Sequence, residues 1–277
     1  MPTWREHLRL AQIYRFVSSF RSAFRGVYST FEEARRAAPD HLKLGHDHPE
    51  TAQTHRGYVD KLRLSDYAVL FWMARILDNS TSVFDLGGHI GVAYYAFRKY
   101  LHFNPNLHWT VCDVPQVVQS GREFAAGLQA AQLSFTTNFR EASGTDILLT
   151  AGAVQYIETP LAEILASLAR KPTHLLINRV PLSSGQDFVT LQRIGPQIHP
   201  YHVFRRDAFL DSLRGLGYRL VDSWEISETF CGSCVIPFHP DKTVEPYSGL
   251  YLRLESDETG EARRTLPELT VPMLAAP

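Results

Sequence analysis

The stretch Val83-Phe84-Asp85-Leu86-Gly87-Gly88-His89-Ile90-Gly91 decides the fold of this 277-residue chain. Its first four residues read as a short apolar strand, which runs into glycines and then into a helix expected over 91–101. Glycines let the backbone turn sharply and let a ligand approach the main chain closely. The helix that follows points its amide donors to the same place. The stretch therefore predicts a ligand site at the carboxyl end of a buried strand.

Apolar segments alternate with helical segments along the rest of the chain. Further strands are expected at 109–112, 133–136, 146–150, 174–178, 218–224 and 250–254. Helices are expected at 64–77, 115–128, 161–169 and 207–216, and Pro115 suits the first turn of its helix. Buried strands that alternate with helices at this spacing indicate βαβ units and a mostly parallel sheet. The fold class predicted is α/β and Rossmann-like.

The ends of the chain have a different character. Residues 1–26 read as a basic amphipathic helix or two, which packs on its own domain, on a second subunit to form a homodimer, or on a membrane surface. A short helix capped by Thr30 and a loop over 40–57 follow. We expect a helical N-terminal extension or cap over 1–80, a cofactor-binding domain over 81–254 and a loosely ordered tail over 255–277.

Composition limits the classes of partner. Lys plus Arg is 28 and Asp plus Glu is 29, so the formal net charge of −1 predicts no bulk attraction to nucleic acid. The sequence contains no uninterrupted run of about 18 apolar residues, so no membrane span is predicted. Three cysteines make no even disulfide framework, and the N-terminus does not read as a secretory signal. A cytoplasmic protein with a small-molecule partner is expected.

The charge of the turn distinguishes two classes of cofactor. Asp85 precedes the glycines, and a carboxylate there would repel a pyrophosphate but attract the ammonium or sulfonium of S-adenosylmethionine. Asp113, with Val114 beside it, ends the next strand 22 residues after Gly91. An acid at that place can accept hydrogen bonds from both ribose hydroxyls. In the following loop, Asn138 offers an amide to an adenine edge and Phe139 a ring to its face. S-adenosylmethionine is the cofactor predicted.

Several segments resemble class I methyltransferases. Cys112-Asp113-Val114-Pro115-Gln116-Val117-Val118 is similar to the Asp-Leu-Pro-x-Val-Val segment of small-molecule O-methyltransferases. More narrowly, the chain resembles a family of bacterial methyltransferases often encoded beside genes for surface polysaccharides. The matching pieces are the glycine turn and residues 24–34, 153–158, 178–182 and 217–224.

The resemblance implies a seven-stranded sheet with one antiparallel strand at the end. It also implies cofactor contacts at Asp85, Gly87, Gly88, Gly91 and Asp113. The chain departs from the class at His89, where many members have glycine or another small residue. The resemblance supplies no acceptor, and a hydroxyl of a sugar, glycan or other small molecule is the hypothesis.

Candidate groups for catalysis follow the fourth and fifth expected strands. Gln155 and Tyr156 can flank the transferred methyl group, although Tyr156 can also simply pack on the sheet. Arg179 can bind an acidic acceptor or pair with a nearby carboxylate. His89 can act as a base, line the acceptor pocket or only hydrogen-bond its own loop.

A second polar cluster comprises His199, Tyr201 and His202, which can cap the acceptor pocket. Cys231-Gly232-Ser233-Cys234 lacks a second pair of ligands, so no metal site is predicted.

Other functions remain open at this level. The chain can be a cofactor-binding scaffold without turnover, a nicotinamide-dependent oxidoreductase, or an enzyme that uses S-adenosylmethionine without methyl transfer. The Asp before the turn argues against the oxidoreductase.

Overall fold

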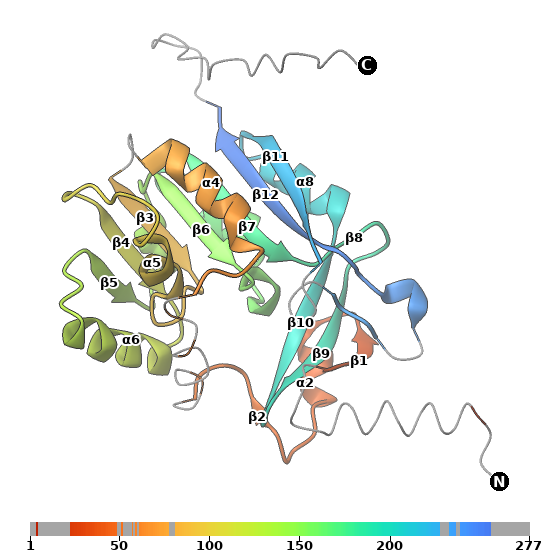
Figure 1. Cartoon of the computed structure of the whole chain (residues 1–277). Coiled ribbons are helices and arrows are strands. Elements are labelled where there is room, and N and C mark those ends of the chain that lie inside the picture. Colours follow the sequence, from red (N-terminus) through yellow and green to blue (C-terminus); the bar gives the residue numbers. More distant parts are fainter. Residues whose placement is uncertain are drawn as a thin grey trace, which may run out of the picture.

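The computed structural model of the protein describes residues 4, 23–48, 51, 57, 59, 61–77, 81–227, 233–236 and 239–255. Its main element is a seven-stranded sheet with the strand order β11-β12-β7-β6-β3-β4-β5 (Figure 1). The strands are β3 (Ser82–Leu86), β4 (His108–Cys112), β5 (Leu133–Thr136), β6 (Ile147–Ala151), β7 (His174–Val180), β11 (Tyr218–Ile226) and β12 (Tyr247–Leu254). All seven were predicted from the sequence, with boundaries that differ by a few residues.

The direction of the strands confirms the predicted fold class. β3 pairs in parallel with both β4 and β6, β5 is parallel to β4, and β7 is parallel to β6. β12 is antiparallel to both of its neighbours, β7 and β11. The last strand of the sheet in the sequence is therefore the one antiparallel strand, and the carboxyl ends of β3, β4, β5, β6 and β7 lie at one common edge.

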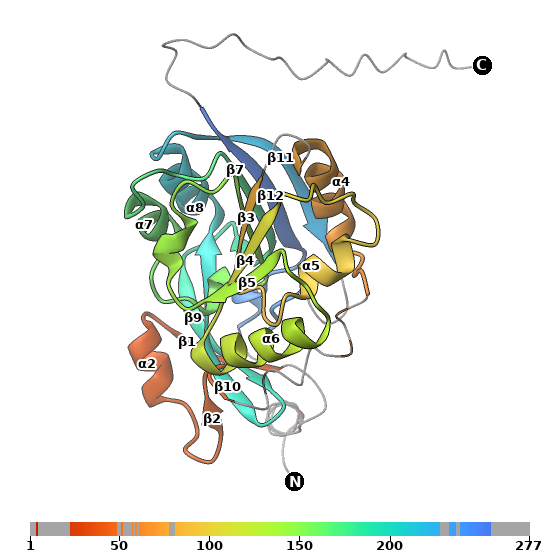
Figure 2. The same cartoon turned by 90° about the vertical axis from the view of Figure 1, so that its left-hand side faces the viewer.

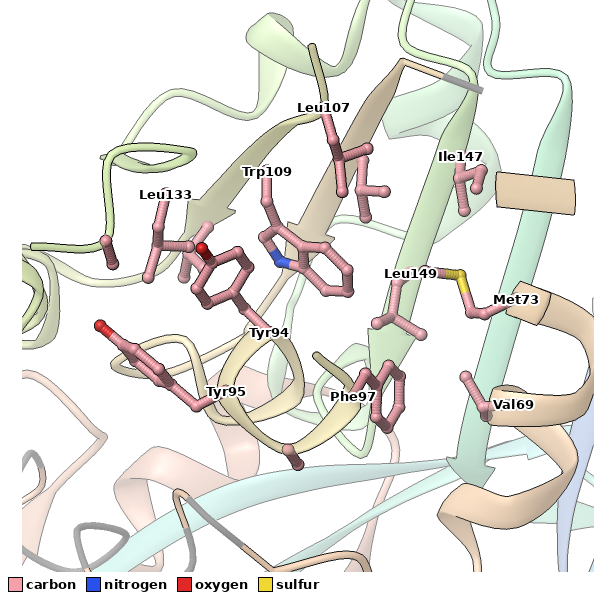
Figure 3. Close-up of a cluster of buried hydrophobic side chains, with 14 of the residues drawn as sticks. Val69, Met73, Tyr94, Tyr95, Phe97, Leu107, Trp109, Leu133, Ile147 and Leu149 are labelled. Atoms are coloured by element: carbon pink, nitrogen blue, oxygen red, sulfur yellow. The ribbon is translucent and has the colours of Figure 1, made fainter. Parts of the chain in front are cut away.

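Helices cover both faces of this sheet (Figure 2). One face packs against α4 (Asp66–Ile76), α5 (Val92–Phe97) and α6 (Pro115–Gly127), and Figure 3 shows the buried cluster between these helices and the sheet. The other face packs against α7 (Leu161–Ala166) and α8 (Arg206–Arg214). Because both faces are buried, the central strands are apolar nearly throughout, which is the pattern that made them visible in the sequence.

A second, five-stranded sheet was not predicted. It contains β1 (Ala23–Tyr28), β2 (Lys43–Leu44), β8 (Leu182–Ser183), β9 (Phe188–Ile194) and β10 (Gln197–Arg205). The helix expected to extend to residue 26 is therefore wrong over 23–26, and residues 5–22 lie outside the described part of the chain. The signal was weak because buried polar residues and Pro200 interrupt the apolar pattern of β9 and β10.

The two faces of the second sheet have different neighbours. α2 (Phe31–Arg36) covers one face through Phe31 and Ala34, and its Thr30 cap was predicted. Thr30 Oγ1 accepts a hydrogen bond of 3.1 Å from the amide of Glu33. The other face joins the ends of β11 and β12 in a separate apolar cluster. This face also contacts η4 (Val154–Tyr156), the short helix after β6, so the second sheet lies over the carboxyl edge of the large sheet (Figure 1).

The remaining expectations concern membrane spans, cysteines, metal ligands and the C-terminal tail. In the part of the chain that the structure describes, no helix has the length and apolarity to span a membrane. Cys234 is buried in the apolar cluster beside β12, whereas Cys231 lies outside the described residues. No group of potential metal ligands occurs among the described residues. The tail from residue 256 onward is likewise outside them, and the domain boundaries stay a prediction.

Candidate cofactor and acceptor site

Two glycines of the turn occupy positions that only glycine suits. Gly87 and Gly91 have φ values of 73° and 90°, in the left-handed region that side chains disfavour. A Cβ at Gly87 would lie 2.1 Å from the Cβ of Ala153, on the turn after β6. A Cβ at Gly91 would lie 2.8 Å from Leu133 Cδ2. The turn is therefore packed tightly against the loop after β6 and against β5, with its backbone at the carboxyl edge of the sheet.

Asp85 is a buried acid beneath this turn. Its side chain is 1% exposed, and Trp109 Nε1 donates a hydrogen bond of 3.2 Å to it. A Cβ at Gly88 would lie 2.4 Å from the Asp85 carboxyl group, so the third glycine makes room for the acid. Burial raises the pKa of Asp85 to about 7, partly opposed by the Trp109 hydrogen bond. A nearby cationic group would reverse this rise by favouring the carboxylate.

Asp113 lies one strand away and faces the same turn. Its Oδ2 accepts a hydrogen bond of 2.9 Å from the amide of His89, and its Oδ1 accepts one of 2.8 Å from the amide of Val114. Burial raises the pKa of Asp113 to about 6, although these two amides lower it. The predicted proximity of Asp113 to the glycine turn is therefore present, and the acid braces the turn through His89.

His89 adopts a left-handed backbone conformation, with φ at 57°. This conformation is uncommon for residues other than glycine and explains why many related turns have a small residue here. Its Nε2 donates to the carbonyl oxygen of Thr51 over 3.0 Å. Burial lowers the pKa of His89 to about 4, so the imidazole is neutral at pH 7. The side chain thus hydrogen-bonds a distant segment rather than its own loop, and a role as base stays a prediction.

Asn138 and Phe139 follow β5 at the same edge of the sheet. The side chain of Asn138 is exposed and caps η3 (Phe139–Ala142) by accepting a hydrogen bond of 3.1 Å from the amide of Arg140. Phe139 packs partly buried against the core below the sheet. Both therefore have a structural role in this loop, and their predicted contacts with adenine stay predictions.

Arg179 pairs with a carboxylate of the same chain. It lies at the end of β7, is 8% exposed, and has a φ of 57°. Its Nη1 donates to Asp66 Oδ1 over 2.7 Å, and its Nη2 donates to the carbonyl of Ala151 over 2.8 Å. The alternative of a structural ion pair is thus realised, with Asp66 at the start of α4 as the partner. The guanidinium therefore holds α4 against the ends of β6 and β7.

Gln155 and Tyr156 lie on η4 and point to different neighbours. Gln155 is 3% exposed and donates from Nε2 to the carbonyl of Arg179 over 3.3 Å. The Tyr156 hydroxyl donates to Gln192 Oε1 on β9. The Tyr156 ring also meets the ring of Tyr201 edge-on, with centroids 5.1 Å apart. Tyr156 is therefore packed between the two sheets.

Tyr201 and His202 do not share a pocket. They are consecutive residues of a strand, so their side chains point to opposite faces. Tyr201 is 1% exposed, and its hydroxyl donates to the hydroxyl of Tyr247 over 2.8 Å. His202 lies on the α2 side, with Nε2 3.6 Å from Asp187 Oδ1. The prediction that both cap one pocket is corrected, because only Tyr201 is on the face toward Tyr156.

Sequence reasoning missed several polar residues between the sheets. His46 follows β2, and its ring stacks on that of His199 on β10. Thr51 bridges the glycine turn and the second sheet, because its hydroxyl accepts from Gln197 Nε2 over 2.7 Å while its carbonyl accepts from His89. Only the clustering of histidines over 41–48 and 199–202 could have drawn attention to this region.

Solved structures share the fold, whereas no protein-family model and no curated protein matches the sequence. The mitomycin 7-O-methyltransferase MmcR has a TM-score of 0.41 and 17% identity over 68% of this chain, which spans 54% of that enzyme's length. The 1,6-didemethyltoxoflavin-N1-methyltransferase of Burkholderia thailandensis, solved with its substrate and S-adenosylhomocysteine, has a TM-score of 0.46 and 18% identity, with 92% of this chain and 93% of that chain covered.

An O-methyltransferase family protein from Burkholderia thailandensis has a TM-score of 0.50 and 14% identity, with 92% of this chain and 71% of that chain covered. At such identities the likeness is one of fold. The chain has the class I methyltransferase fold, and its structural neighbours include O- and N-methyltransferases.

Proposed function

We propose that this protein is an S-adenosylmethionine-dependent methyltransferase that acts on a hydroxyl group of a small molecule, such as a sugar. The observation that carries the proposal is the combination of the glycine turn with two buried carboxylates. Asp85 and Asp113 meet this turn at the carboxyl edge of a mostly parallel seven-stranded sheet. Open α/β sheets bind their ligands at that edge.

The residues present fit the cofactor in charge. The absence of a Cβ at Gly88 lets the Asp85 carboxyl group lie directly beneath the turn. Asp85, a buried acid with one hydrogen bond from Trp109, would gain from a cationic amino group. Each carboxylate oxygen of Asp113 accepts one hydrogen bond from a backbone amide. Each oxygen has a further lone pair that could accept a hydrogen bond from a ribose hydroxyl. A pyrophosphate would add negative charge beside both acids.

When bound, S-adenosylmethionine would supply an activated methyl group that moves to the acceptor oxygen as the hydroxyl proton is released. This chain's contribution is chiefly to hold the acceptor in line, which can be worth on the order of 7 kcal/mol or more. His89 is the candidate to take up the proton; burial keeps its imidazole neutral at pH 7 and also makes it a weaker base. Gln155 and Tyr156 lie on the neighbouring loop and are proposed to position the acceptor. Arg179 would act by fixing that loop, since its guanidinium already pairs with Asp66.

The proposal is tested by calorimetric titration with S-adenosylhomocysteine and, in parallel, with NADH. Micromolar binding of S-adenosylhomocysteine alone supports the cofactor assignment. Binding of NADH alone, or of neither compound, overturns it. The Asp113→Asn variant is titrated in the same way to test the contribution of the carboxylate, because it keeps the shape of the side chain and removes its charge.

A radiolabel assay with S-adenosyl-[methyl-³H]methionine separates an enzyme from a scaffold. Transfer of the label to a sugar or other hydroxylated molecule supports the proposed reaction. Binding of S-adenosylhomocysteine without transfer to any acceptor of this kind would favour the scaffold and overturn the reaction.

A further inference from the structure

The face of β10 that looks toward the carboxyl edge of the large sheet is polar. Gln197, His199 and Tyr201 alternate along the strand and share this face. Gln192 of β9 lies directly opposite His199 in the register, and accepts from the Tyr156 hydroxyl. These polar side chains are buried rather than solvated. A buried polar face over a candidate catalytic edge calls for a chemical explanation.

His199 is the centre of this face. It is 1% exposed, and its ring stacks on the His46 ring with centroids 3.7 Å apart and an interplanar angle of 17°. The Tyr156 ring meets both imidazoles edge-on, at 4.7 Å from His46 and 5.7 Å from His199. Three elements from distant parts of the sequence thus place three polar aromatic rings together.

Several nitrogen atoms of the two imidazoles have no hydrogen-bond partner among the described residues. Both ring nitrogens of His199 and the Nε2 of His46 are buried and make no hydrogen bond to the residues that the structure describes. Buried polar atoms in folded proteins are almost always hydrogen-bonded, because an unpaired one loses its hydration without compensation. Buried, unpaired nitrogen atoms on two stacked rings therefore indicate a ligand that completes their hydrogen bonds.

The charge of the cluster limits that ligand. Burial lowers the pKa of His46 to about 4, with smaller contributions from His89 and His48, and it lowers the pKa of His199 to about 2, with smaller contributions from His46 and His48. The other titratable groups that face them are His48, His89, Tyr156 and Tyr201, and His89 and Tyr201 are likewise held neutral by burial. A neutral imidazole offers one donor and one acceptor. A hydroxyl group matches this pair, whereas a carboxylate or an ammonium would meet no opposite charge.

The cluster is also close to the turn where the cofactor is proposed to bind. His89 of that turn contributes to lowering the pKa of His46. Thr51 contacts both the His89 side chain and Gln197, which is two residues before His199 on the same face of β10. A molecule against the imidazoles would therefore lie beside the glycine turn.

We propose that the stacked His46–His199 pair is the acceptor-binding wall of the site, and that it selects an uncharged molecule with hydroxyl groups, such as a neutral sugar. The proposal rests on the proposed methyltransferase function and names its substrate class. The second sheet, through β10 and the segment after β2, then acts as the specificity element that covers the catalytic edge. His199 binds the acceptor, and His46 shields the other face of its ring.

A first experiment needs no acceptor. His199→Leu keeps the volume but removes two unpaired nitrogens, so its melting temperature without ligand should rise by about 2–4 °C or more. His202→Leu makes the same change on the opposite face of the same strand, where the ring meets Asp187, and should not raise it. A fall in the melting temperature of His199→Leu would show a structurally satisfied histidine and overturn the proposal.

A second experiment measures selection of the acceptor with S-adenosyl-[methyl-³H]methionine. The probes are methyl glycosides of glucose, galactose and mannose, with glucuronate and glucosamine as charged counterparts. We expect transfer to a neutral glycoside only, and a loss of about tenfold or more in kcat/KM for His199→Leu and for His46→Phe. His202→Leu should keep the activity of the wild type.

The outcomes separate the two proposals. If wild-type protein fails to bind S-adenosylhomocysteine, the proposed function falls. If it binds this compound but labels the charged sugars, labels none of the probes, or retains full activity in His199→Leu, the acceptor assignment alone is overturned. Unchanged affinity of His199→Leu for S-adenosylhomocysteine confirms that any loss concerns the acceptor.

Discussion

Replacement of Asp85 by Asn should stabilise the ligand-free protein, and the gain should depend on pH. Asn keeps the shape of the side chain and an oxygen that can accept from Trp109 Nε1. Burial raises the pKa of Asp85 from 3.8 to about 7. Since each pKa unit corresponds to about 1.4 kcal/mol, the ionised form costs the folded state on the order of 4 kcal/mol at pH 8.

The sign follows from proton linkage. Between pH 3.8 and about 7 the folded protein keeps the Asp85 proton that the unfolded chain has lost, so the contribution of this residue to stability falls as the pH rises through that window. The variant should therefore match the wild type near pH 4 and exceed it by up to about 4 kcal/mol at pH 8. His46 and His174, whose pKa values burial lowers to about 4, act in the opposite direction. They act equally in both proteins, so the difference between the two isolates Asp85.

The assay is urea denaturation of both proteins at several pH values from 4 to 8, followed by titration with S-adenosylhomocysteine. Stability and binding should change in opposite directions, because the carboxylate that destabilises the ligand-free protein is the proposed partner of the cofactor's ammonium group. We expect affinity to fall by about tenfold or more. A variant no more stable than the wild type at pH 8, or one that binds equally well, would refute this account of Asp85.

Three further changes test other parts of the site. Asp113→Ala should weaken binding of S-adenosylhomocysteine by several-fold or more, as measured by calorimetry, because it removes the proposed acceptor of the ribose hydroxyls; an unchanged dissociation constant would exclude the ribose assignment. Arg179→Met should destabilise the protein by about 3 kcal/mol in urea denaturation, since it removes the cationic partner of the partly buried Asp66 carboxylate, and the double variant with Asp66→Leu should recover most of that loss. If the double variant is as unstable as the single one, the ion pair is not the source. Gly87→Ala should abolish cofactor binding or soluble expression, because its Cβ would lie 2.1 Å from that of Ala153 at a φ of 73°; normal binding would show that the turn is looser than described.

Local patterns were enough to predict the large sheet. Its strands are buried on both faces, so each forms a short apolar run between helical segments, and the glycine turn marks the first of them. The position of Asp113 beside that turn was also predictable, because the carboxyl ends of adjacent parallel strands meet at one edge. The number of strands and the one antiparallel strand came from the resemblance to class I methyltransferases, whereas the order of the strands was seen only in the structure.

Long-range contacts decided what the sequence left open. Whether Arg179 binds a ligand or a carboxylate depended on where α4 places Asp66, which is 113 residues away in the chain. Tyr201 faces the site and His202 does not, because they are neighbours in the strand β10. The sequence did not reveal this strand, because its buried polar residues conceal the alternation of apolar and polar side chains.

By itself, then, the sequence determined the glycine turn and the sheet that carries it, because periodicity and glycine conformation act between near neighbours in the chain. The tertiary structure alone decided how the second sheet covers that edge and brings His46 onto His199, because stacking of residues so far apart leaves no local pattern.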